Sequence, residues 1–397
     1  MNQPDYYTGN WNFPTPIRFG PGRISELPDA CRELGMSRPL LVTDSGLAGS
    51  EILRRSVGAC GDAGMECGVF SQVQGNPVEE NVNGGVRVFR DGGHDGVIAF
   101  GGGSGLDAAK AVALMVGQDR PIWDFEDRED WWTRVNDKGM APVVAVPTTA
   151  GTGSEVGRAS VITDNTDHTK KIIFHPNMLP ARVILDPELT VGLPAGITAA
   201  VGMDALSHNL EAFCSPLFHP MAQGIALQGM QLIHRSLKRA YEDGSDLDAR
   251  SEMLAASTMG ATAFQKGLGA MHALSHPCGA LLDTHHGLTN AVVMPYVLVF
   301  NRPSIEDRMT GLAKYLGLPE PSFQAVLDWV LELRESIGIP HTLGDLGVQE
   351  NLVDELTRRA VVDPSGATNP VSLNEFNLAQ LYRAAISGNL DSLTGAV

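Results

Sequence analysis

Four of the chain's eleven histidines lie within fifteen residues of an otherwise apolar stretch, at His272, His276, His285 and His286. An unpaired imidazole is costly to bury in such surroundings, so this concentration calls for a chemical explanation. The spacing of four between the first two places them on one face of a predicted helix. A second predicted helix repeats that spacing with Asp204 and His208.

These side chains form a donor set for a transition metal. A carboxylate and several neutral imidazoles suit Fe²⁺ or Zn²⁺ and lack the oxygen-rich set that Ca²⁺ or Mg²⁺ prefers. A single i, i+4 pair is more often a cap or a satisfied core histidine, but two pairs followed by His286 favour a site of one aspartate and three histidines. Such a site leaves positions open for a substrate oxygen. Pro277 predicts that the backbone leaves regular helix at His276, and Gly287 predicts a turn at His286.

A glycine-rich turn, Gly101 to Gly105, follows a predicted buried strand over 96–100 and precedes a predicted helix over 106–116. Glycines at a helix amino terminus let the backbone N–H groups approach a phosphate closely, and the helix dipole favours its negative charge. The strict G-x-G-x-x-G fingerprint is absent, although Gly103-x-Gly105-x-x-Ala108 fits its looser form. A purely structural tight turn is the alternative interpretation.

Two further polar segments come at the ends of predicted strands. Residues 148–154, which include Thr148, Thr149 and Thr152, follow a strand over 141–146. Asp44 follows a strand over 40–43, where it could accept hydrogen bonds from ribose hydroxyls and repel a 2′-phosphate, which favours NAD over NADP. The alternative for Asp44 is a turn or helix cap.

The pattern along the chain predicts two domains, over 1–192 and 193–397. Short β-branched runs alternate with helical stretches from about residue 38 to 190, including a strand over 65–73 and a helix over 78–90, which is typical of parallel strands joined by crossover helices. From about residue 195, alanine, leucine and methionine recur at helical spacing. We therefore expect an α/β domain, a helical domain and a cleft between them. Residues 123–137 read as an ordered surface loop, and a strand around Trp11 to Phe19 could pair across a homodimer.

The composition of the chain excludes several classes of binding partner and favours one cellular compartment. The formal charge is −17 without a basic cluster, which argues against nucleic acid and anionic membranes as partners. No apolar run is long enough to cross a bilayer, and Met1 to Tyr7 lack the features of a signal peptide. Five cysteines without a C-x-x-C pair argue against a disulfide framework and a thiolate zinc site, so we expect a cytoplasmic protein. His94, His168, His175, His219 and His234 read as surface or structural residues.

The chain resembles the iron-containing (group III) alcohol dehydrogenase family. The resemblance rests on motifs spread over about residues 40 to 300: Gly101-Gly-Gly-Ser104 with Asp107-Ala-Ala-Lys110, Pro147 to Val156, Asp186 to Thr190, Gly202 to His208, and His272 to Gly287. It implies a Rossmann-like dinucleotide-binding domain followed by an all-helical metal and substrate domain, as in the dehydroquinate synthase-like architecture. It also implies a metal-dependent alcohol dehydrogenase or aldehyde reductase that transfers a hydride between a primary or small alcohol and NAD, with Fe²⁺ as the first expectation for the metal and Zn²⁺ as the second.

The resemblance also implies roles for individual residues. The metal ligands would be Asp204, His208, His272 and His286, and His276 would relay a proton. The cofactor positions would be Asp44, Asn76, Gly102, Gly103, Ser104, Thr148, Thr149, Thr152 and Lys170. Spacing alone does not separate Lys170 from its neighbour Lys171. His285 stands where the family often has proline.

Other functions on the same architecture stay open at this point. A glycerol-type dehydrogenase or maleylacetate reductase is the nearest alternative, a dehydroquinate synthase-like lyase is a more distant one, and an NAD sensor without catalysis is the third. A sensor does not need an open metal site, and the Asp204 and His208 pair with a third ligand histidine favours the dehydrogenase.

Overall fold

The computed structural model describes residues 9–11, 14–167 and 169–393. His168 and the segment Met1 to Tyr7 lie outside the described residues. The chain divides into two compact units, Met1–Gly192 and Leu193–Val397.

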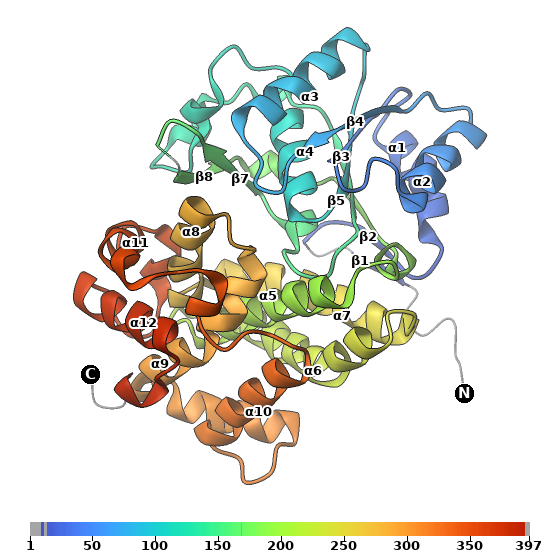
Figure 1. Ribbon diagram of the computed structural model, residues 1–397. Coiled ribbons are helices and arrows are strands. Elements are labelled where there is room, and N and C mark those ends of the chain that lie inside the picture. Colours follow the sequence, from blue (N-terminus) through green and yellow to red (C-terminus); the bar gives the residue numbers. More distant parts are fainter. Residues whose placement is uncertain (1–8, 12–13, 168, 394–397) are drawn as a thin grey trace. The chain divides into compact units, whose positions relative to one another are not determined.

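The first unit is built on a seven-stranded sheet (Figure 1). Its strand order is β1-β2-β9-β6-β5-β3-β4, and every neighbouring pair is parallel except β1 with β2. The strands are β1 Gly9–Trp11, β2 Ile17–Phe19, β3 Leu40–Asp44, β4 Gly68–Val73, β5 Val97–Gly101, β6 Val143–Pro147 and β9 Arg182–Leu185. This Rossmann-like sheet confirms the predicted fold class of the amino-terminal part.

Helices cover both faces of the central strands, which explains why those strands are apolar throughout. On one face Leu41, Ile98, Phe100 and Val144 pack in a core with residues of α1 Leu27–Glu33 and α2 Glu51–Asp62. The alternate residues of the strands point to the opposite face, where α4 Gly103–Met115 packs on β3, β5 and β6. Figure 1 shows α3 Glu79–Asp91 beside α4 on that face.

The order of the strands reverses beside β3. The chain passes from β3 outward to β4 and then returns to β5 on the other side of β3. In open α/β sheets, ligands bind at the carboxyl ends of the strands where the order reverses. The residues that follow β3 and β5 are therefore placed where a dinucleotide would be expected.

A two-stranded antiparallel sheet, β7 Ala159–Asp164 and β8 Thr169–Phe174, lies outside the main sheet and packs on α4. The expected surface loop over 123–137 packs on this hairpin, since Glu126 forms a β-bridge with Ile173. It begins with a short 3₁₀ helix, Ile122–Phe125, whose two end residues are buried. The loop is therefore partly core, which the sequence interpretation did not anticipate.

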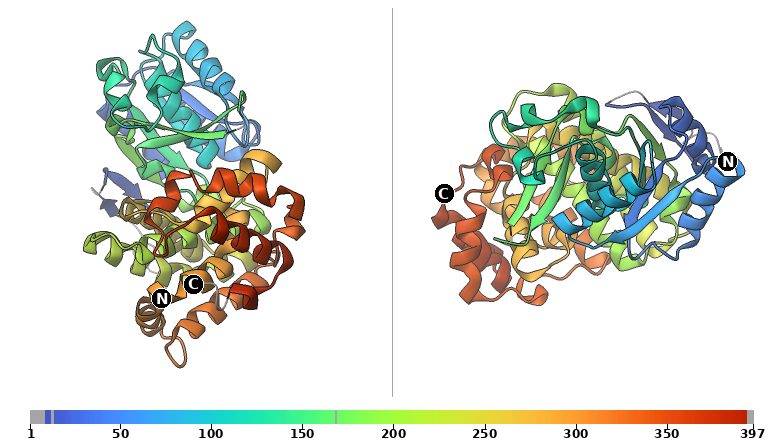
Figure 2. Two further views of the ribbon diagram at one scale, coloured as in Figure 1. Left: turned by 90° about the vertical axis from the view of Figure 1, so that its left-hand side faces the viewer. Right: turned by 90° about the horizontal axis from the view of Figure 1, so that it is seen from above.

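The second unit contains only helices among its described residues, 193–393. Helix α5 packs on α6, α7 and α9, and α8 packs on α9 (Figures 1 and 2). The helices are α5 Ala195–Cys214, α6 Pro220–Glu242, α7 Leu247–Ala263, α8 Ala270–Leu282, α9 His286–Leu316, α10 Phe323–Ser336, α11 Val353–Ala360 and α12 Glu375–Ser387. In the described part of the chain, no helix has the length and apolarity needed to span a membrane.

Some local predictions were wrong. Helix α8 continues through Pro277 instead of leaving regular helix at His276, because the surrounding turn is buried and its packing outweighs the missing N–H. His286 is the first residue of α9 and not part of a turn. Helix α4 begins at Gly103 instead of Leu106, and the strand expected from residue 65 begins at Gly68. The segment around Trp11 to Phe19 contains two strands, β1 and β2.

Candidate metal centre and cofactor edge

Helix α5 carries two of the predicted metal ligands on its buried face. Asp204 is 3% exposed and His208 is 4% exposed. His272, on α8, is 2% exposed, and one donor atom from each of the three residues lies within 4.8 Å of the others. Two imidazoles and a carboxylate so close together form a donor set that fits a divalent transition metal.

The fourth predicted ligand, His286, reaches this cluster from the first turn of α9. Its Nε2 lies 3.6 Å from Asp204 Oδ1. The next residue, Gly287, allows this approach, because a Cβ there would lie 2.5 Å from the Ala200 carbonyl oxygen and 2.9 Å from Asp204 Cβ. The glycine therefore sets how closely α9 packs against α5.

A buried carboxylate orients one of the imidazoles. Glu211 Oε2 lies 2.6 Å from His272 Nδ1, and its Oε1 accepts the Met271 N–H at 2.7 Å. Burial lowers the pKa of His272, but the charge and hydrogen bond of Glu211 outweigh it and the net shift is upward. With the Nδ1 hydrogen donated to Glu211, the His272 Nε2 lone pair is the donor available to a metal, as in carboxylate–histidine–metal arrangements.

The side-chain amide of Asn290 lies among the same donor atoms. Its Nδ2 donates to Asp204 Oδ1 at 2.9 Å and lies 3.3 Å from His272 Nε2 and 3.2 Å from His286 Nε2. An amide N–H₂ carries two hydrogens, and Asp204 Oδ1 accepts one of them, so the other can be accepted by the unprotonated Nε2 of one of the two imidazoles. Carboxylate and imidazole lone pairs therefore converge on one point, which supports a cation-binding role for the cluster.

The other two histidines of the stretch have different environments. His276 stacks on His286, with ring centroids 5.2 Å apart, and its Nδ1 lies 2.8 Å from Asp363 Oδ2. His285 is exposed and caps α9, accepting the Leu288 N–H through Nδ1 at 3.3 Å. His175 caps the 3₁₀ helix Pro176–Met178 and His219 caps α6, each by accepting a backbone N–H through Nδ1. Both contacts agree with a structural role.

Sequence reasoning missed three residues of this cluster. Glu211 follows His208 by three positions on α5, so the stripe at Asp204 and His208 could have been extended to it. Asn290 follows His286 by four positions, which is also a helical spacing. Asp363 is 87 positions from His276, and no local pattern connects the two.

In the first unit, the predicted phosphate-binding loops lie against each other. A Cβ at Gly103 would lie 2.5 Å from Thr152 Oγ1, and one at Gly102 would lie 3.2 Å from Thr149 Cγ2. The Ser104 hydroxyl donates to the carbonyl of Gly75, the residue before Asn76. The strand-end segments at 75–76, 102–104 and 148–152 therefore meet at one edge of the sheet.

Asp44 caps a turn, and its second carboxylate oxygen lies near the glycine-rich turn. Its Oδ1 accepts the N–H groups of Gly46 and Leu47 at 2.9 and 3.2 Å, which is the turn-capping alternative. Its Oδ2 lies 3.2 Å from where a Cβ at Gly101 would be, close to the glycine-rich turn. One carboxylate oxygen therefore stabilises the turn while the other faces the predicted cofactor edge.

The two neighbouring lysines of β8, Lys170 and Lys171, have different environments. Lys171 Nζ binds Asp164 Oδ2 at 2.5 Å and Asp167 Oδ2 at 3.2 Å, and it lies 5.1 Å from the centre of the Trp123 ring. Adjacent residues of a strand point to opposite faces, so Lys170 points away from these partners. Its neighbour across the hairpin, Thr163, forms a bridge with Val78, two residues after Asn76.

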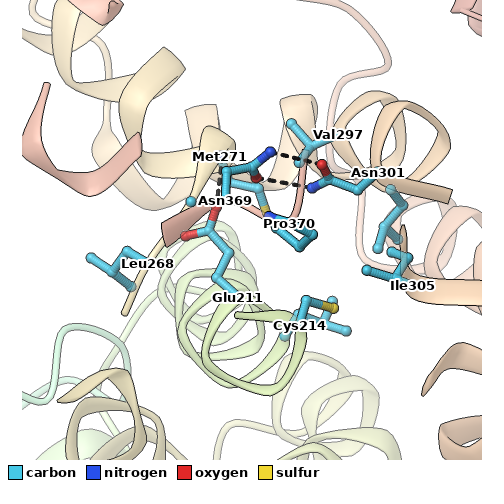
Figure 3. Close-up of a pocket in the computed structure, with 12 residues that line it drawn as sticks. Glu211, Cys214, Leu268, Met271, Val297, Asn301, Ile305, Asn369 and Pro370 are labelled. Carbon is cyan, nitrogen blue, oxygen red and sulfur yellow. Dashed lines mark hydrogen bonds between the residues drawn. The ribbon is translucent and has the colours of Figure 1, made fainter. Parts of the chain in front are cut away.

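A small cavity is lined by Glu211 together with residues of α8 and α9 and the segment at 369–370 (Figure 3). Figure 3 shows Asn301 and Asn369 at its wall, and their amides are paired by two hydrogen bonds of 2.9 and 2.7 Å. The lining is mostly apolar and includes none of the four predicted metal ligands. This cavity is therefore not the place where a substrate oxygen would meet a metal.

Comparisons with known proteins agree with this geometry. The family model described as "Iron-containing alcohol dehydrogenase" matches residues 14–187, and the model of the family's C-terminal part matches residues 198–386. A 4-hydroxybutyrate dehydrogenase from Cupriavidus necator is 42% identical, covering 90% of this chain and 94% of the relative.

Two solved structures have similar folds. A crystal structure of 1,3-propanediol oxidoreductase is 35% identical, with a TM-score of 0.89 over 96% of this chain and 99% of that one. Sulfoacetaldehyde reductase from Bifidobacterium kashiwanohense, in complex with NAD⁺, is 30% identical, with a TM-score of 0.86 over 96% and 98%.

The chain belongs to the iron-containing alcohol dehydrogenase family. It is an NAD-dependent alcohol dehydrogenase, an oxidoreductase that acts on alcohols or aldehydes. The family, the fold class and the enzyme class predicted from the sequence are therefore confirmed.

Proposed function

We propose that the enzyme transfers a hydride between a small primary alcohol and NAD, at a divalent metal held by Asp204, His208, His272 and His286. The observation that carries the proposal is the convergence of the Asp204 carboxylate and the Nε2 atoms of His272 and His286 on the Asn290 amide. When bound, the metal polarises the alcohol oxygen and lowers its pKa. Fe²⁺ is the first candidate and Zn²⁺ the second, since both accept these ligands.

The protein side chains position this chemistry. Glu211 holds the His272 ring with its Nδ1 hydrogen bound, so that Nε2 is available as a donor. Asn290 holds Asp204 Oδ1, and Gly287 lets His286 approach the same point. His276 is the proposed acceptor of the alcohol proton, because its Nδ1 is already occupied by Asp363 and its ring stacks on a proposed metal ligand.

For the cofactor we propose NAD, bound by Asp44, Asn76, Gly102, Gly103, Ser104, Thr148, Thr149, Thr152 and Lys170. The close packing of the loops that carry these residues supports the proposal, as does their position at the reversal of the strand order. Asp44 favours NAD because its carboxylate would repel the 2′-phosphate of NADP. Lys170 is preferred to Lys171, which already binds two carboxylates.

For the substrate we propose a short alcohol with a terminal hydroxyl. The relatives named 4-hydroxybutyrate dehydrogenase and 1,3-propanediol dehydrogenase are 42% and 35% identical and favour chains that carry a second polar group. We therefore expect 4-hydroxybutyrate and 1,3-propanediol to be better substrates than ethanol.

The test is an activity panel. The enzyme, reconstituted separately with Fe²⁺ and Zn²⁺, is given each alcohol with NAD⁺ or NADP⁺, and NADH formation is followed by its absorbance. We expect activity with NAD⁺ that is lost on chelation and restored by added metal. Full activity after chelation would overturn the metal site, and a preference for NADP⁺ would overturn the role of Asp44.

We also propose a homodimer or larger oligomer and a cytoplasmic location. Strand β1 is the outermost strand of its sheet, where a second chain could pair, and five free cysteines fit a reducing compartment. Light scattering coupled to gel filtration measures the oligomeric state directly.

A further inference from the structure

Asp363 contacts the proposed proton acceptor, although it lies in a different part of the chain. Its Oδ2 is 2.8 Å from His276 Nδ1, and the two side chains are only 13% and 19% exposed. A hydrogen bond this short between a carboxylate and an imidazole in a sheltered place fixes the orientation of the ring.

The carboxylate is itself held by the backbone. Asp363 Oδ1 accepts the Ser365 N–H at 2.9 Å and so caps the 3₁₀ helix Pro364–Thr368. Burial raises the pKa of Asp363, but His276 and Ser365 outweigh it and hold the pKa below its usual value. The carboxylate is therefore ionised at neutral pH and accepts a hydrogen on each oxygen.

The segment that follows Asp363 is anchored to the beginning of α8. The Thr368 hydroxyl donates to the Leu268 carbonyl at 2.6 Å, and Asn369 Oδ1 accepts the Ala270 N–H at 3.1 Å. These contacts fix the segment at the first turn of α8, while Asp363 meets the helix near its middle. The position of the carboxylate relative to His276 is therefore set by three separate contacts.

We propose that Asp363 is a positioning residue of the reaction, which holds the His276 ring with hydrogen on Nδ1 and leaves Nε2 to exchange the alcohol proton. This inference rests on the proposed function of His276. The ring is confined on its face by His286, with an interplanar angle of 14°, and at Nδ1 by Asp363. Only Nε2 of the neutral ring then has a lone pair available.

Variants of Asp363 distinguish this positioning role from a purely structural role as the cap of the 3₁₀ helix Pro364–Thr368. Asp363→Ser keeps an oxygen for the Ser365 N–H but is too short to reach His276. Asp363→Asn keeps the size of the side chain and an oxygen for the Ser365 N–H, but it presents an N–H₂ group to His276 Nδ1 and so favours the tautomer with hydrogen on Nε2. The exposed Asp354, on α11, provides a matched control as Asp354→Ser.

The test measures kcat, KM and metal content for these variants, for His276→Ala and for the double variant with Asp363→Ser. We expect Asp363→Ser to lower kcat about tenfold to a hundredfold, as loss of an orienting partner does, with KM for NAD⁺ and metal content unchanged. Asp363→Asn should lower kcat at least as much, because its N–H₂ group favours hydrogen on His276 Nε2, and Asp354→Ser should match the wild type. In the His276→Ala background, Asp363→Ser should change kcat less than about twofold, because residues that act together are not additive.

A second readout does not depend on turnover. In the zinc-loaded enzyme labelled with ¹⁵N-histidine, the ring nitrogen shifts of His276 report which nitrogen carries the hydrogen. We expect the Nδ1–H form in the wild type and a mixture of both forms in Asp363→Ser.

Three results would overturn the inference: the same fold loss with and without His276, a loss that follows metal content, or an Nε2–H tautomer in the wild type. If the wild type has no NAD-dependent activity, the proposed function fails instead, and the tautomer measurement still decides whether Asp363 positions the ring.

Discussion

Glu211 and His272 form a buried pair in which the carboxylate Oε2 lies 2.6 Å from the imidazole Nδ1, with both side chains at most 5% exposed. The other oxygen of Glu211 binds the Met271 N–H, so the carboxylate is fixed at the first turn of α8. The pair connects α5 to α8 and determines which nitrogen of His272 faces Asp204.

Replacing Glu211 with alanine should weaken metal binding. The change removes the acceptor of the Nδ1 hydrogen, so His272 can rotate or change tautomer, and loss of such a partner costs about tenfold to a hundredfold in metal affinity. Metal retained after dialysis against a graded chelator series measures this loss. The control is Glu332→Gln on the exposed face of α10, and equal retention in both variants would contradict the role of Glu211.

Replacing Gly287 with alanine should both destabilise the protein and weaken metal binding. The added Cβ would lie 2.5 Å from the Ala200 carbonyl oxygen, so α9 must shift away from α5 and carry His286 with it. Overpacking of this kind costs about 1–3 kcal/mol in the free energy of unfolding.

Gly311 provides the matched control for that change. It lies on the same helix, is exposed, and has no atom within 4 Å of its hypothetical Cβ. Gly311→Ala should stabilise the protein by up to about 1 kcal/mol without affecting metal binding. Denaturant unfolding of both variants gives the comparison, and a stabilised Gly287→Ala would contradict the packing argument.

Asp164 should make the β7–β8 hairpin sensitive to acid. Burial raises its pKa, but Lys171 and Thr166 outweigh that effect and lower the pKa to about 2. Because the pKa is lower in the folded state than in the unfolded state, this stabilisation is present above about pH 4 and is lost as the pH falls towards 2. Asp164→Asn should therefore be less stable than the wild type at pH 7 and about equally stable near pH 2. A difference that stays constant across this range would contradict the assignment.

The two lysines of β8 should differ in their effects. Lys170→Ala should raise KM for NAD⁺ with little change in thermal stability, because we propose that it contacts the cofactor. Lys171→Ala should lower thermal stability, because it leaves Asp164 and Asp167 without their ion pairs. Steady-state kinetics and thermal melts of both variants test the assignment, and the opposite pattern would show that Lys171 is the cofactor contact.

The success of the sequence interpretation depended on the distance along the chain between the residues concerned. Asp204 with His208, and the strand ends that carry Asp44 and Gly103, are local patterns, and helical or sheet geometry is enough to place them. Glu211 and Asn290 continue the same helical spacings and could have been found.

Other features depended on contacts between elements that no local pattern encodes. Pro277 favours a helix end on local grounds, yet the packing around α8 keeps the helix intact. Asp363 reaches His276 only because the 3₁₀ segment after it is anchored to Leu268 and Ala270, about a hundred positions away. Neither outcome could be read from neighbouring residues.

The long separation between His276 and Asp363 also bears on how the protein is made. Because synthesis proceeds from the amino terminus, all four proposed metal ligands leave the ribosome before Asp363 does. A nascent or truncated chain that ends before residue 363 would therefore contain the complete ligand set without the partner of His276. The proposed metal ligands would thus be present in the growing chain before both the partner of His276 and the residues that anchor the start of α8.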